Sequence, residues 1–595
     1  MSVCKTTVPV FLGALLAAGL TAQEHADLVL TGGRIATRAD GEGFVEALAV
    51  KDGLVHAVGT DAEMRKLAGP SSRVVALGGR TVIPGLCDSH LHAVRGGRFY
   101  NLELRWDGVP TLAKALAMVR AQAARTPKGQ WVRVVGGWSP FQFAERRMPT
   151  VAELNEAAPD TPVFVLFLYS KAFLNSAGVE ALGIKPDTVP PRGGRYAFAD
   201  GGAELLGEPE PTILYQTIAA LPQMSAADQV NSTLHFCREL NRFGLTSAAD
   251  PGGGGHSFPE DYAACKQLGE QGRLPLRIAC YLFPQKPGRE LDDFRAWTEG
   301  NAAPGPEPRV QTGGFWLAGG GELLVYPASD YENFLAPRPQ LERSMELQLE
   351  AVVTQLAGKG WPFRIHATYA ESIDRILDVF ERVDKKQPLR DLHWAIDHAE
   401  TIRAEQIKRI ARLGGGIAIQ DRMAFAGEFF VDRYGKDAAA TAPPLRLLVD
   451  SGIPLGCGTD GTRVSGYNPW LSLYWLVSGK TVGGTELYAP QNRLTRTEAL
   501  RLYTVGSAWF CGDEKRRGTL RPGQRADFAV LSADWFTVPE EAIRSIESLL
   551  TVVAGKPVYG AAPFADLSPE LPAVSPAWSP VAEVRGYHEA SAGRR

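Results

Sequence analysis

Eight short apolar runs, most of them separated by segments with a helical hydrophobic period, constrain the fold of this 595-residue chain more than any other feature. Strands that are buried on both faces of a parallel sheet form continuous apolar runs, and helices connect them. Eight such units predict an α/β fold in which the strands close into a distorted (β/α)8 TIM barrel. The runs are Val82–Leu86, Leu245–Ala249, Leu276–Phe283, Gly314–Ala318, Pro362–Ile365, His393–Asp397, Gly416–Ile419 and Ile453–Gly456.

The two ends of the chain have a different pattern, in which short alternating apolar segments are broken by Gly and Asp. This pattern is typical of a β-meander. We therefore predict one small composite β-sandwich domain from residues 23–82 and 515–560, and a barrel domain from residues 83–514. Residues 101–234, approximately, are too long for a normal connection and are expected to form an insertion that covers the barrel mouth. The Pro- and Ala-rich residues 561–595 are expected to form an extended tail.

The first 22 residues have the order of a secretory signal peptide. Lys5 precedes an apolar run from Val8 to Leu20, and small residues follow around Ala22. The run is too short to span a membrane comfortably. We expect an exported protein, periplasmic or secreted, with no membrane span in the mature chain; a buried N-terminal helix is the alternative.

Charge and composition favour small-molecule chemistry. The formal net charge is -3, and the chain has no long basic run that would bind nucleic acid. With 45% apolar residues, the chain can bury a large core. We expect a small-molecule substrate and no nucleic-acid partner, and leave a homo-oligomer open.

Two of the chain's 10 histidines close the first apolar run, in the segment VIPGLCDSHLH. His90 and His92 alternate with Leu91, so both imidazoles project to the same side of a strand. In a barrel, this side would lie at the C-terminal end of the strand, where active sites form. Taken alone, the pair fits two half-exposed strand histidines better than a metal site.

Three further residues of suitable chemistry end later runs: His366, His398 and Asp460. Each alone fits a satisfied buried polar residue, but all five at strand ends predict a site for Zn²⁺ or another divalent metal ion. Such an ion lowers the pKa of bound water to about 7 and polarises a carbonyl oxygen. Asp460 beside that water would remove its proton and deliver it to a leaving nitrogen. The predicted reaction is hydrolysis of an amide-like bond, with Asp460 as the catalytic residue.

Several segments together resemble the amidohydrolase superfamily, specifically the YtcJ-like branch that includes N-substituted formamide deformylase. They are VIPGLCDSHLH, GGWSPFQFAERRMPTVAELNEAAPDTPVFV, FLNSAGVEALGI, NRFGLTSAAD and NRLTRTEALRLYTVGSAWFCGDEKRRGTLRPGQRADFAVL. The resemblance runs from about Ala26 to Gly560. It implies a distorted barrel with a composite β-sandwich. It also implies that His90, His92, His366, His398 and Asp460 are metal ligands.

The chain departs from this family at the fourth strand. Relatives commonly carry a Val-Lys-Leu-Phe-Ala-Asp-Gly block there, whose carboxylated lysine bridges two metals, whereas this chain has Trp316 at the lysine position and Gly320 at the aspartate position. Three outcomes follow: a subset of the five ligands holds one metal, Glu322 acts as a substitute carboxylate, or hydrolysis is lost. We favour one metal ion per chain. The family's Gly-His before WVNS is also replaced, by Tyr169 and Ser170.

Four residues are predicted to contact substrate: Trp138, Trp316, Arg146 and His256. For the aromatic residues, a place in the hydrophobic core is the alternative; for the arginine, a solvated surface position is. Two other functions remain open at this point. The barrel could bind a ligand without turnover, which a Trp316 that seals the water site would favour, or it could be a metal-assisted isomerase or lyase.

Overall fold

The computed structural model describes residues 25–38, 43–207, 211–304, 313–331, 334–335 and 337–584. The signal peptide predicted for residues 1–22 lies outside these ranges, as does the end of the predicted tail, residues 585–595. Within the described ranges, no helix is both long enough and apolar enough to span a membrane.

Eight parallel strands form the central sheet, in the order β8-β14-β15-β16-β17-β18-β19-β20. Each strand pairs with the next one along the chain, which is the arrangement of a (β/α)8 barrel. The predicted fold class is confirmed. The strands are β8 (Leu86–Asp88), β14 (Leu245–Asp250), β15 (Arg277–Leu282), β16 (Phe315–Gly320), β17 (Phe363–Ala367), β18 (Trp394–His398), β19 (Gly416–Gln420) and β20 (Leu455–Gly458).

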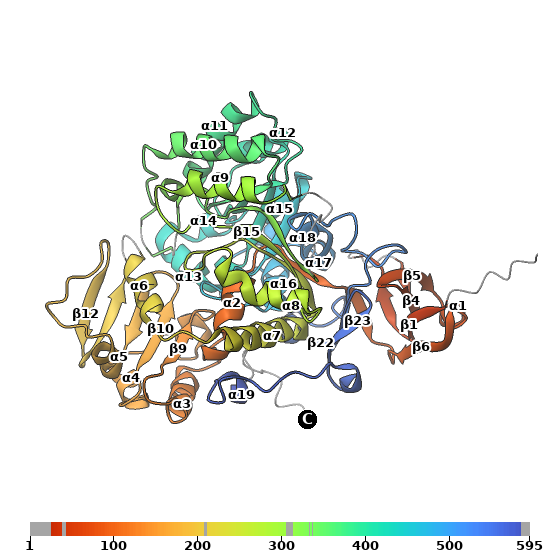
Figure 1. Cartoon of the computed structure of the whole chain (residues 1–595), viewed down its shortest axis with the longest axis horizontal. Coiled ribbons are helices and arrows are strands. Elements are labelled where there is room, and N and C mark those ends of the chain that lie inside the picture. Colours follow the sequence, from red (N-terminus) through yellow and green to blue (C-terminus); the bar gives the residue numbers. More distant parts are fainter. Residues whose placement is uncertain are drawn as a thin grey trace, which may run out of the picture.

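Amphipathic helices connect these strands and cover the sheet (Figure 1). In α11 (Ala370–Asp384), the buried residues Ile373, Ile376, Leu377 and Phe380 recur every three or four positions, which places them on one helix face. The other helices of this part are α2 (Ala93–Phe99), α7 (Ala226–Arg242), α8 (Ala263–Glu270), α9 (Glu290–Gly300), α10 (Met345–Gly358), α12 (Ala404–Leu413), α13 (Arg422–Tyr434), α14 (Lys436–Ala439), α15 (Leu445–Asp450), α16 (Pro469–Ser478), α17 (Arg496–Arg501) and α18 (Ser507–Trp509).

Hydrogen bonds that do not form a regular β-ladder join the segments at the two edge strands, β8 and β20. The Asp88 carboxylate accepts from the backbone N of Thr459 (3.1 Å) and from its hydroxyl (2.8 Å). The backbone N of Asp460 donates to the His90 carbonyl oxygen at 2.8 Å. Gly458 permits this close approach, because a Cβ there would lie 2.4 Å from an Asp88 carboxylate oxygen. These contacts bring the segment of His90 beside the segment of Asp460.

The predicted first barrel strand, Val82–Leu86, is divided between two sheets, which corrects the sequence prediction. β7 (Thr81–Pro84) pairs with a C-terminal strand, whereas β8 begins the barrel. The chain changes sheet at Gly85, where the Thr246 side chain would lie 2.3 Å from a Cβ.

The two ends of the chain together build a β-domain, seen at the right of Figure 1. One sheet has the order β5-β4-β1-β6, and the other has the order β23-β22-β21-β7-β2-β3. One hydrophobic cluster contains residues from both ends, such as Leu30 and Phe528. The elements are β1 (Ala26–Thr31), β2 (Arg34–Ala36), β3 (Phe44–Val45), β4 (Ala47–Lys51), β5 (Leu54–Gly59), α1 (Asp61–Arg65), β6 (Ala68–Ala76), β21 (Phe528–Leu531), β22 (Ser548–Val553) and β23 (Lys556–Gly560).

The segment between α2 and α7 contains a sheet of its own, with the order β12-β13-β11-β10-β9, at the lower left of Figure 1. Arg105 ties this insertion to the barrel, because its guanidinium donates to the Thr462 carbonyl oxygen at 3.1 Å. The elements are α3 (Leu112–Ala123), β9 (Val132–Val135), α4 (Val151–Ala157), β10 (Val163–Phe167), β11 (Lys171–Leu174), α5 (Ser176–Ala181), β12 (Arg195–Ala199), β13 (Gly202–Leu206) and α6 (Thr212–Ala220).

The described part of the tail runs along α7 and ends in the short helix α19 (Val581–Val584), near α3 (Figure 1). The Asn231 side chain donates to the Ala573 carbonyl oxygen at 2.9 Å, and the Asn101 side chain donates to that of Ser575 at 2.8 Å. These bonds fix the tail against both the barrel and the insertion.

Candidate metal centre

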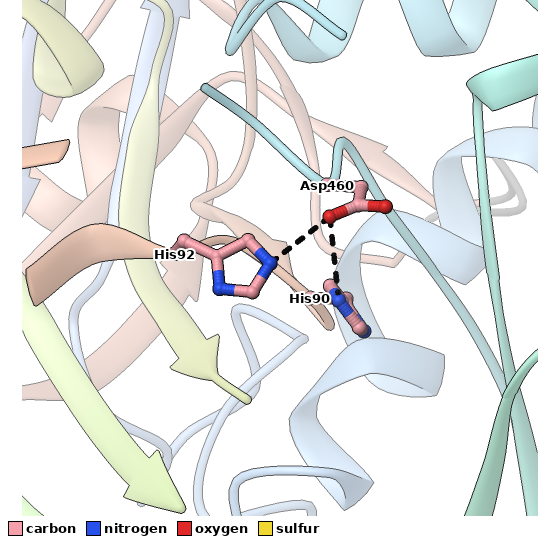
Figure 2. Close-up of side chains that lie close together, drawn as sticks. All are labelled: His90, His92 and Asp460. Carbon is pink, nitrogen blue, oxygen red and sulfur yellow. Dashed lines mark hydrogen bonds and ion pairs between the residues drawn. The ribbon is translucent and has the colours of Figure 1, made fainter. Parts of the chain in front are cut away.

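The five predicted ligands meet at the C-terminal ends of the barrel strands. His90 and His92 follow β8, His366 lies in β17, His398 ends β18, and Asp460 follows β20. All five side chains are buried. Figure 2 shows the Asp460 carboxylate between the two imidazoles of the first motif, with both rings directed at it.

The first group of side chains consists of His90, His92 and Asp460. The Asp460 Oδ1 atom lies 3.1 Å from His92 Nε2 and 3.5 Å from His90 Nε2 (Figure 2). His92 Nδ1 lies 2.6 Å from the Gly252 carbonyl oxygen, to which it donates. This bond leaves the lone pair of His92 Nε2 free to bind a cation.

Glu322 lies in the middle of the four imidazoles. Its Oε2 atom is 3.0 Å from His398 Nε2, 3.1 Å from His366 Nδ1 and 3.7 Å from His90 Nε2. Its Oε1 atom is 3.7 Å from His92 Nε2. The structure thus brings the predicted substitute ligand to the site that the other five residues form.

The backbone around Glu322 explains this position. Glu322 follows β16, and its backbone N donates to the Pro251 carbonyl oxygen at the end of β14. Its carbonyl oxygen accepts from the backbone N of His366 at 3.0 Å. The residue therefore bridges the ends of two strands that flank the site.

The donor set fits a divalent metal ion. Two groups offer ligand atoms that all lie within 4.8 Å of one another: His90 with His92 and Asp460, and His90 with Glu322 and His398. His90 Nε2 and His398 Nδ1 are buried and have no hydrogen-bond partner among the described residues. Buried orphan imidazole nitrogens beside carboxylates suit zinc or a similar cation.

The charges of the site are consistent with a bound cation. Burial raises the pKa of Asp460, but interactions with His90 and His92 outweigh it and hold that pKa well below its usual value. Burial lowers the pKa of His90, but Glu322 and Asp397 outweigh it and raise that pKa to about 9. For His398, burial and then Arg422 lower the pKa well below its usual value, so this imidazole is neutral and can donate its lone pair.

Charged neighbours contact the ring nitrogens of His90 and His366 that face away from the cluster, and so orient the two rings. His90 Nδ1 lies 3.3 Å from an Asp397 carboxylate oxygen and 3.2 Å from Arg364 Nη2, so only Nε2 faces the site. Arg364 Nε donates to Asp397 at 2.7 Å. On the other side, His366 Nε2 lies 3.3 Å from Asp330 Oδ1.

Two candidate ligands have strained backbones. His398 has φ 79° and Asp460 has φ 54°, a left-handed conformation that non-glycine residues rarely adopt. Such strain persists only where the surrounding structure enforces it, and it concentrates at functional sites. Here it directs both side chains into the cluster.

A cavity of about 520 Å³ opens onto the cluster, and His92, His366, Glu322 and Asp460 line its floor. The rest of its lining contains residues that the sequence analysis did not assign to the site. They are cationic (Arg95, Arg98, Arg422, Arg463), phenolic (Tyr169, Tyr215, Tyr326, Tyr331) and apolar (Phe99, Ile218, Phe283, Val464). One signal could have found two of them, because Arg95 and Arg463 each follow a ligand by three positions.

Comparison with known proteins decides the family. A model described as "Amidohydrolase family" matches residues 73–559 of the chain. The chain belongs to the amidohydrolase family. It is 27% identical to YtcJ of Bacillus subtilis over 551 residues, 89% of this chain and 98% of that protein. It is 26% identical to the N-substituted formamide deformylase of Arthrobacter pascens over 557 residues, 89% of this chain and 97% of that protein. The predicted resemblance is confirmed.

Solved structures support the same fold. The crystal structure of an uncharacterized metal-dependent hydrolase from Pyrococcus horikoshii has a TM-score of 0.62 at 22% sequence identity, and the match covers 86% of this chain and 99% of that chain. At this identity the likeness carries the fold and nothing more.

In this amidohydrolase, Trp316 does not lie at the metal cluster. It is the second residue of β16, whereas the ligands lie at the opposite ends of the strands. Its ring faces a second cavity, of about 210 Å³, together with Tyr281 and His393. Trp316 thus lies outside the lining of the main cavity, and its contact with substrate stays a prediction. The carboxylate at the cluster comes from Glu322, in the chain that follows β16.

The other predicted substrate contacts lie outside the lining of the main cavity. Trp138 is buried in the hydrophobic core, stacked on Phe143, and Trp138 Nε1 donates to the Leu166 carbonyl oxygen at 3.0 Å. Arg146 is exposed and donates to the Gly483 carbonyl oxygen at 3.1 Å. Trp138 thus has the core position and Arg146 the surface position that were given as their alternatives, and their contacts with substrate stay predictions. His256 is buried behind the cavity wall, where a Cβ on Gly253 would lie 3.0 Å from its ring; its substrate contact stays a prediction.

Proposed function

We propose that this amidohydrolase is a metal-dependent hydrolase that cleaves a C–N bond of an amide, an N-substituted formamide or a cyclic amide. One observation carries the proposal: two carboxylates, Glu322 and Asp460, lie among four buried imidazoles at the floor of a cavity large enough for a small organic substrate. The Arthrobacter pascens relative, whose name is N-substituted formamide deformylase, supports the choice of bond.

The residues divide the chemistry between them. His90, His92, His398, Glu322 and Asp460 would hold the ion, with His366 beside them. A bound divalent ion supplies Lewis acidity, which acidifies water and polarises an amide carbonyl. Asp460 is ionised and lines the cavity, so its carboxylate accepts a proton from the attacking water and returns it to the leaving nitrogen. Water adds to the acyl carbon, the C–N bond breaks, and an acid and an amine are released.

We propose one ion per chain. The two candidate ligand groups share His90, and His90 Nδ1 is engaged by Asp397 and Arg364. His90 therefore offers one lone pair, at Nε2. It cannot bind a separate ion in each of the two groups at the same time. Glu322 supplies the carboxylate that the family's carboxylated lysine would otherwise provide. The proposal thus combines two of the outcomes left open by the sequence, a single metal ion and Glu322 as the substitute ligand.

Zinc-loaded protein, assayed on a panel of N-formyl and N-acyl amines, tests the proposal. We expect about one ion per chain by elemental analysis, and turnover that a chelator abolishes and zinc restores. Asp460→Asn should lower kcat by at least about 100-fold while the substrate still binds, because a proton acceptor used in the transition state is lost. Activity that survives complete metal removal would overturn the proposal.

The two other functions are distinguished in the same assay. A metal-assisted isomerase or lyase would release product without oxygen from water, so incorporation of ¹⁸O from labelled water into the acid product separates hydrolysis from both. The ligand-binding alternative depended on Trp316 sealing the water site, and the position of Trp316 at the other end of β16 removes that support.

A further inference from the structure

Two arginines that line the cavity form no ion pair with any residue of the described ranges. Arg95 and Arg463 are 5% and 6% exposed, and both line the cavity that His92, Glu322 and Asp460 floor. Within the described ranges, neither guanidinium has a carboxylate within 4.0 Å or a hydrogen bond to another residue. Buried arginines are ordinarily paired, because an uncompensated buried charge is costly.

The other two arginines of the same lining show the ordinary arrangement. Arg98 Nη2 lies 2.6 Å from Asp261, and Arg422 Nη2 lies 2.6 Å from Glu400. The cavity therefore contains two arginines in ion pairs and two outside any ion pair among the described residues. Burial lowers the pKa of Arg95, but nearby Tyr169 and Asp460 outweigh it and raise that pKa. Arg95 and Arg463 also influence each other, since burial and then the charge of Arg95 lower the pKa of Arg463.

Each arginine comes three residues after a candidate ligand, Arg95 after His92 and Arg463 after Asp460. Arg95 lies in α2, for which His92 is the N-cap residue, and the backbone N of Val94 donates to Asp250 at 2.6 Å. The backbone of Arg463 packs on Gly136 of the insertion so closely that a Cβ on Gly136 would lie 1.8 Å from the Arg463 carbonyl oxygen. The backbones that carry the two side chains are therefore fixed before any ligand arrives.

The geometry of the cavity indicates what the two arginines bind. Both line the cavity outside any ion pair with the described residues, and His92, Glu322 and Asp460 lie at its floor. Guanidinium groups match the geometry of a carboxylate, to which they donate two parallel hydrogen bonds.

We infer that the substrate is an amide that carries a carboxylate, and that Arg95 and Arg463 bind this group while the scissile C–N bond lies at the ligand cluster. This inference rests on the proposed function. Phe99 and Phe283 supply apolar lining for the organic part of such a substrate. The carboxylate is unchanged in the reaction, in which water adds to the acyl carbon and the nitrogen leaves with a proton.

A matched pair of substrates tests the inference with zinc-loaded protein. N-formylphenylalanine and N-formylphenethylamine differ only in the carboxylate. We expect kcat/KM of the wild type to be higher for the acid by at least about 10-fold, the range of a charge-assisted hydrogen bond. Arg95→Met and Arg463→Met should each lower kcat/KM for the acid by about 10- to 100-fold more than kcat/KM for the uncharged formamide. Arg120→Met, which removes an exposed charge from α3, is the control.

The outcomes that overturn the inference are specific. Equal kcat/KM values for the two substrates in the wild type, or an equal loss for both in the variants, would do so while the proposed hydrolysis stands. A preference for the phosphonate analogue of N-formylphenylalanine would overturn the assignment to a carboxylate. Melting temperatures close to the wild-type value are expected for both variants, because neither substitution breaks an ion pair.

A binding measurement separates failure of the inference from failure of the proposed function. If neither formamide is hydrolysed, the proposed bond specificity is wrong, and calorimetric titration of 3-phenylpropionate into zinc-loaded protein decides the inference alone. Binding that weakens by at least about 10-fold in Arg95→Met/Arg463→Met supports it. Equal binding by wild type and double variant would place the carboxylate elsewhere and overturn it.

Discussion

Glu322 lies among the imidazoles of a candidate site in which the family's lysine is missing. Its carboxylate interacts with all four imidazoles, at distances between 3.0 and 3.7 Å. Its place depends on two backbone contacts, to Pro251 and to His366, that lie far away in sequence. The sequence could therefore name Glu322 as a candidate, but only the fold could bring it to the cluster.

Replacing Glu322 by glutamine tests its role as a ligand. Glutamine keeps the size and the backbone position but loses the charge and donates where the carboxylate accepts. We expect Glu322→Gln to weaken zinc binding by at least about 10-fold, measured by competition with a chromophoric chelator, and to lower turnover in parallel. Glu156→Gln, at an exposed position of α4, is the control. Unchanged zinc affinity would exclude Glu322 as a ligand.

Asp397 is predicted to act on the metal through His90. Asp397→Asn leaves the buried Arg364 without a countercharge and removes the carboxylate beside His90 Nδ1. We expect a loss of about 3 to 5 kcal/mol in the free energy of unfolding, measured by denaturant titration. Zinc affinity should fall about 10- to 100-fold. Adding Arg364→Met should recover stability but not zinc affinity; recovery of both would mean that Asp397 only balances charge.

At the scale of elements, the burial of each strand decides what could be predicted. The run Gly416–Ile419 corresponds to β19 (Gly416–Gln420), because a strand that is covered on both faces keeps a continuous apolar run. The run Val82–Leu86 was wrongly predicted as one barrel strand, because β7 and β8 are both buried but belong to different sheets. Arg95 and Arg463 were not predicted, although each follows a predicted ligand by three positions. That spacing alone does not show whether the arginine side chain faces a cavity or solvent.

The insertion is predicted to hold the loop of Asp460 through Arg105. Two guanidinium nitrogens of Arg105 donate to the Thr462 carbonyl oxygen at 3.1 Å, while Glu103 and Asp107 balance the charge. Arg105→Lys keeps the charge but not the fork, so it should free this carbonyl. We expect hydrogen exchange at residues 460–466 to become about 10-fold faster and kcat to fall, with exchange in the terminal β-domain unchanged. Arg120→Lys is the control, and uniform acceleration would indicate general destabilisation instead.

At the scale of the molecule, the ligand cluster spans the two weakest seams of the barrel. Within the described residues, β8 and β20 share no ladder pair, and β16 pairs with β17 at one position, Gly320 with Phe363. His90, His92 and Asp460 come from the two sides of the first seam, and Glu322 and His366 come from the two sides of the second. A bound ion would therefore tie together strands that backbone hydrogen bonds leave loosely joined.

Removing the metal should consequently loosen the barrel at these seams and not elsewhere. Binding stabilises a protein by about 4 kcal/mol when the free ion exceeds its dissociation constant 1,000-fold, so chelation should lower the melting temperature measurably. We expect faster hydrogen exchange after chelation in β8, β16, β17 and β20, and little change in β19 or in the terminal β-domain. Zinc should reverse both effects in the wild type but not in His90→Ala, whose ring belongs to both ligand groups. Acceleration spread evenly over all eight strands would show that the ion stabilises the fold without closing the seams.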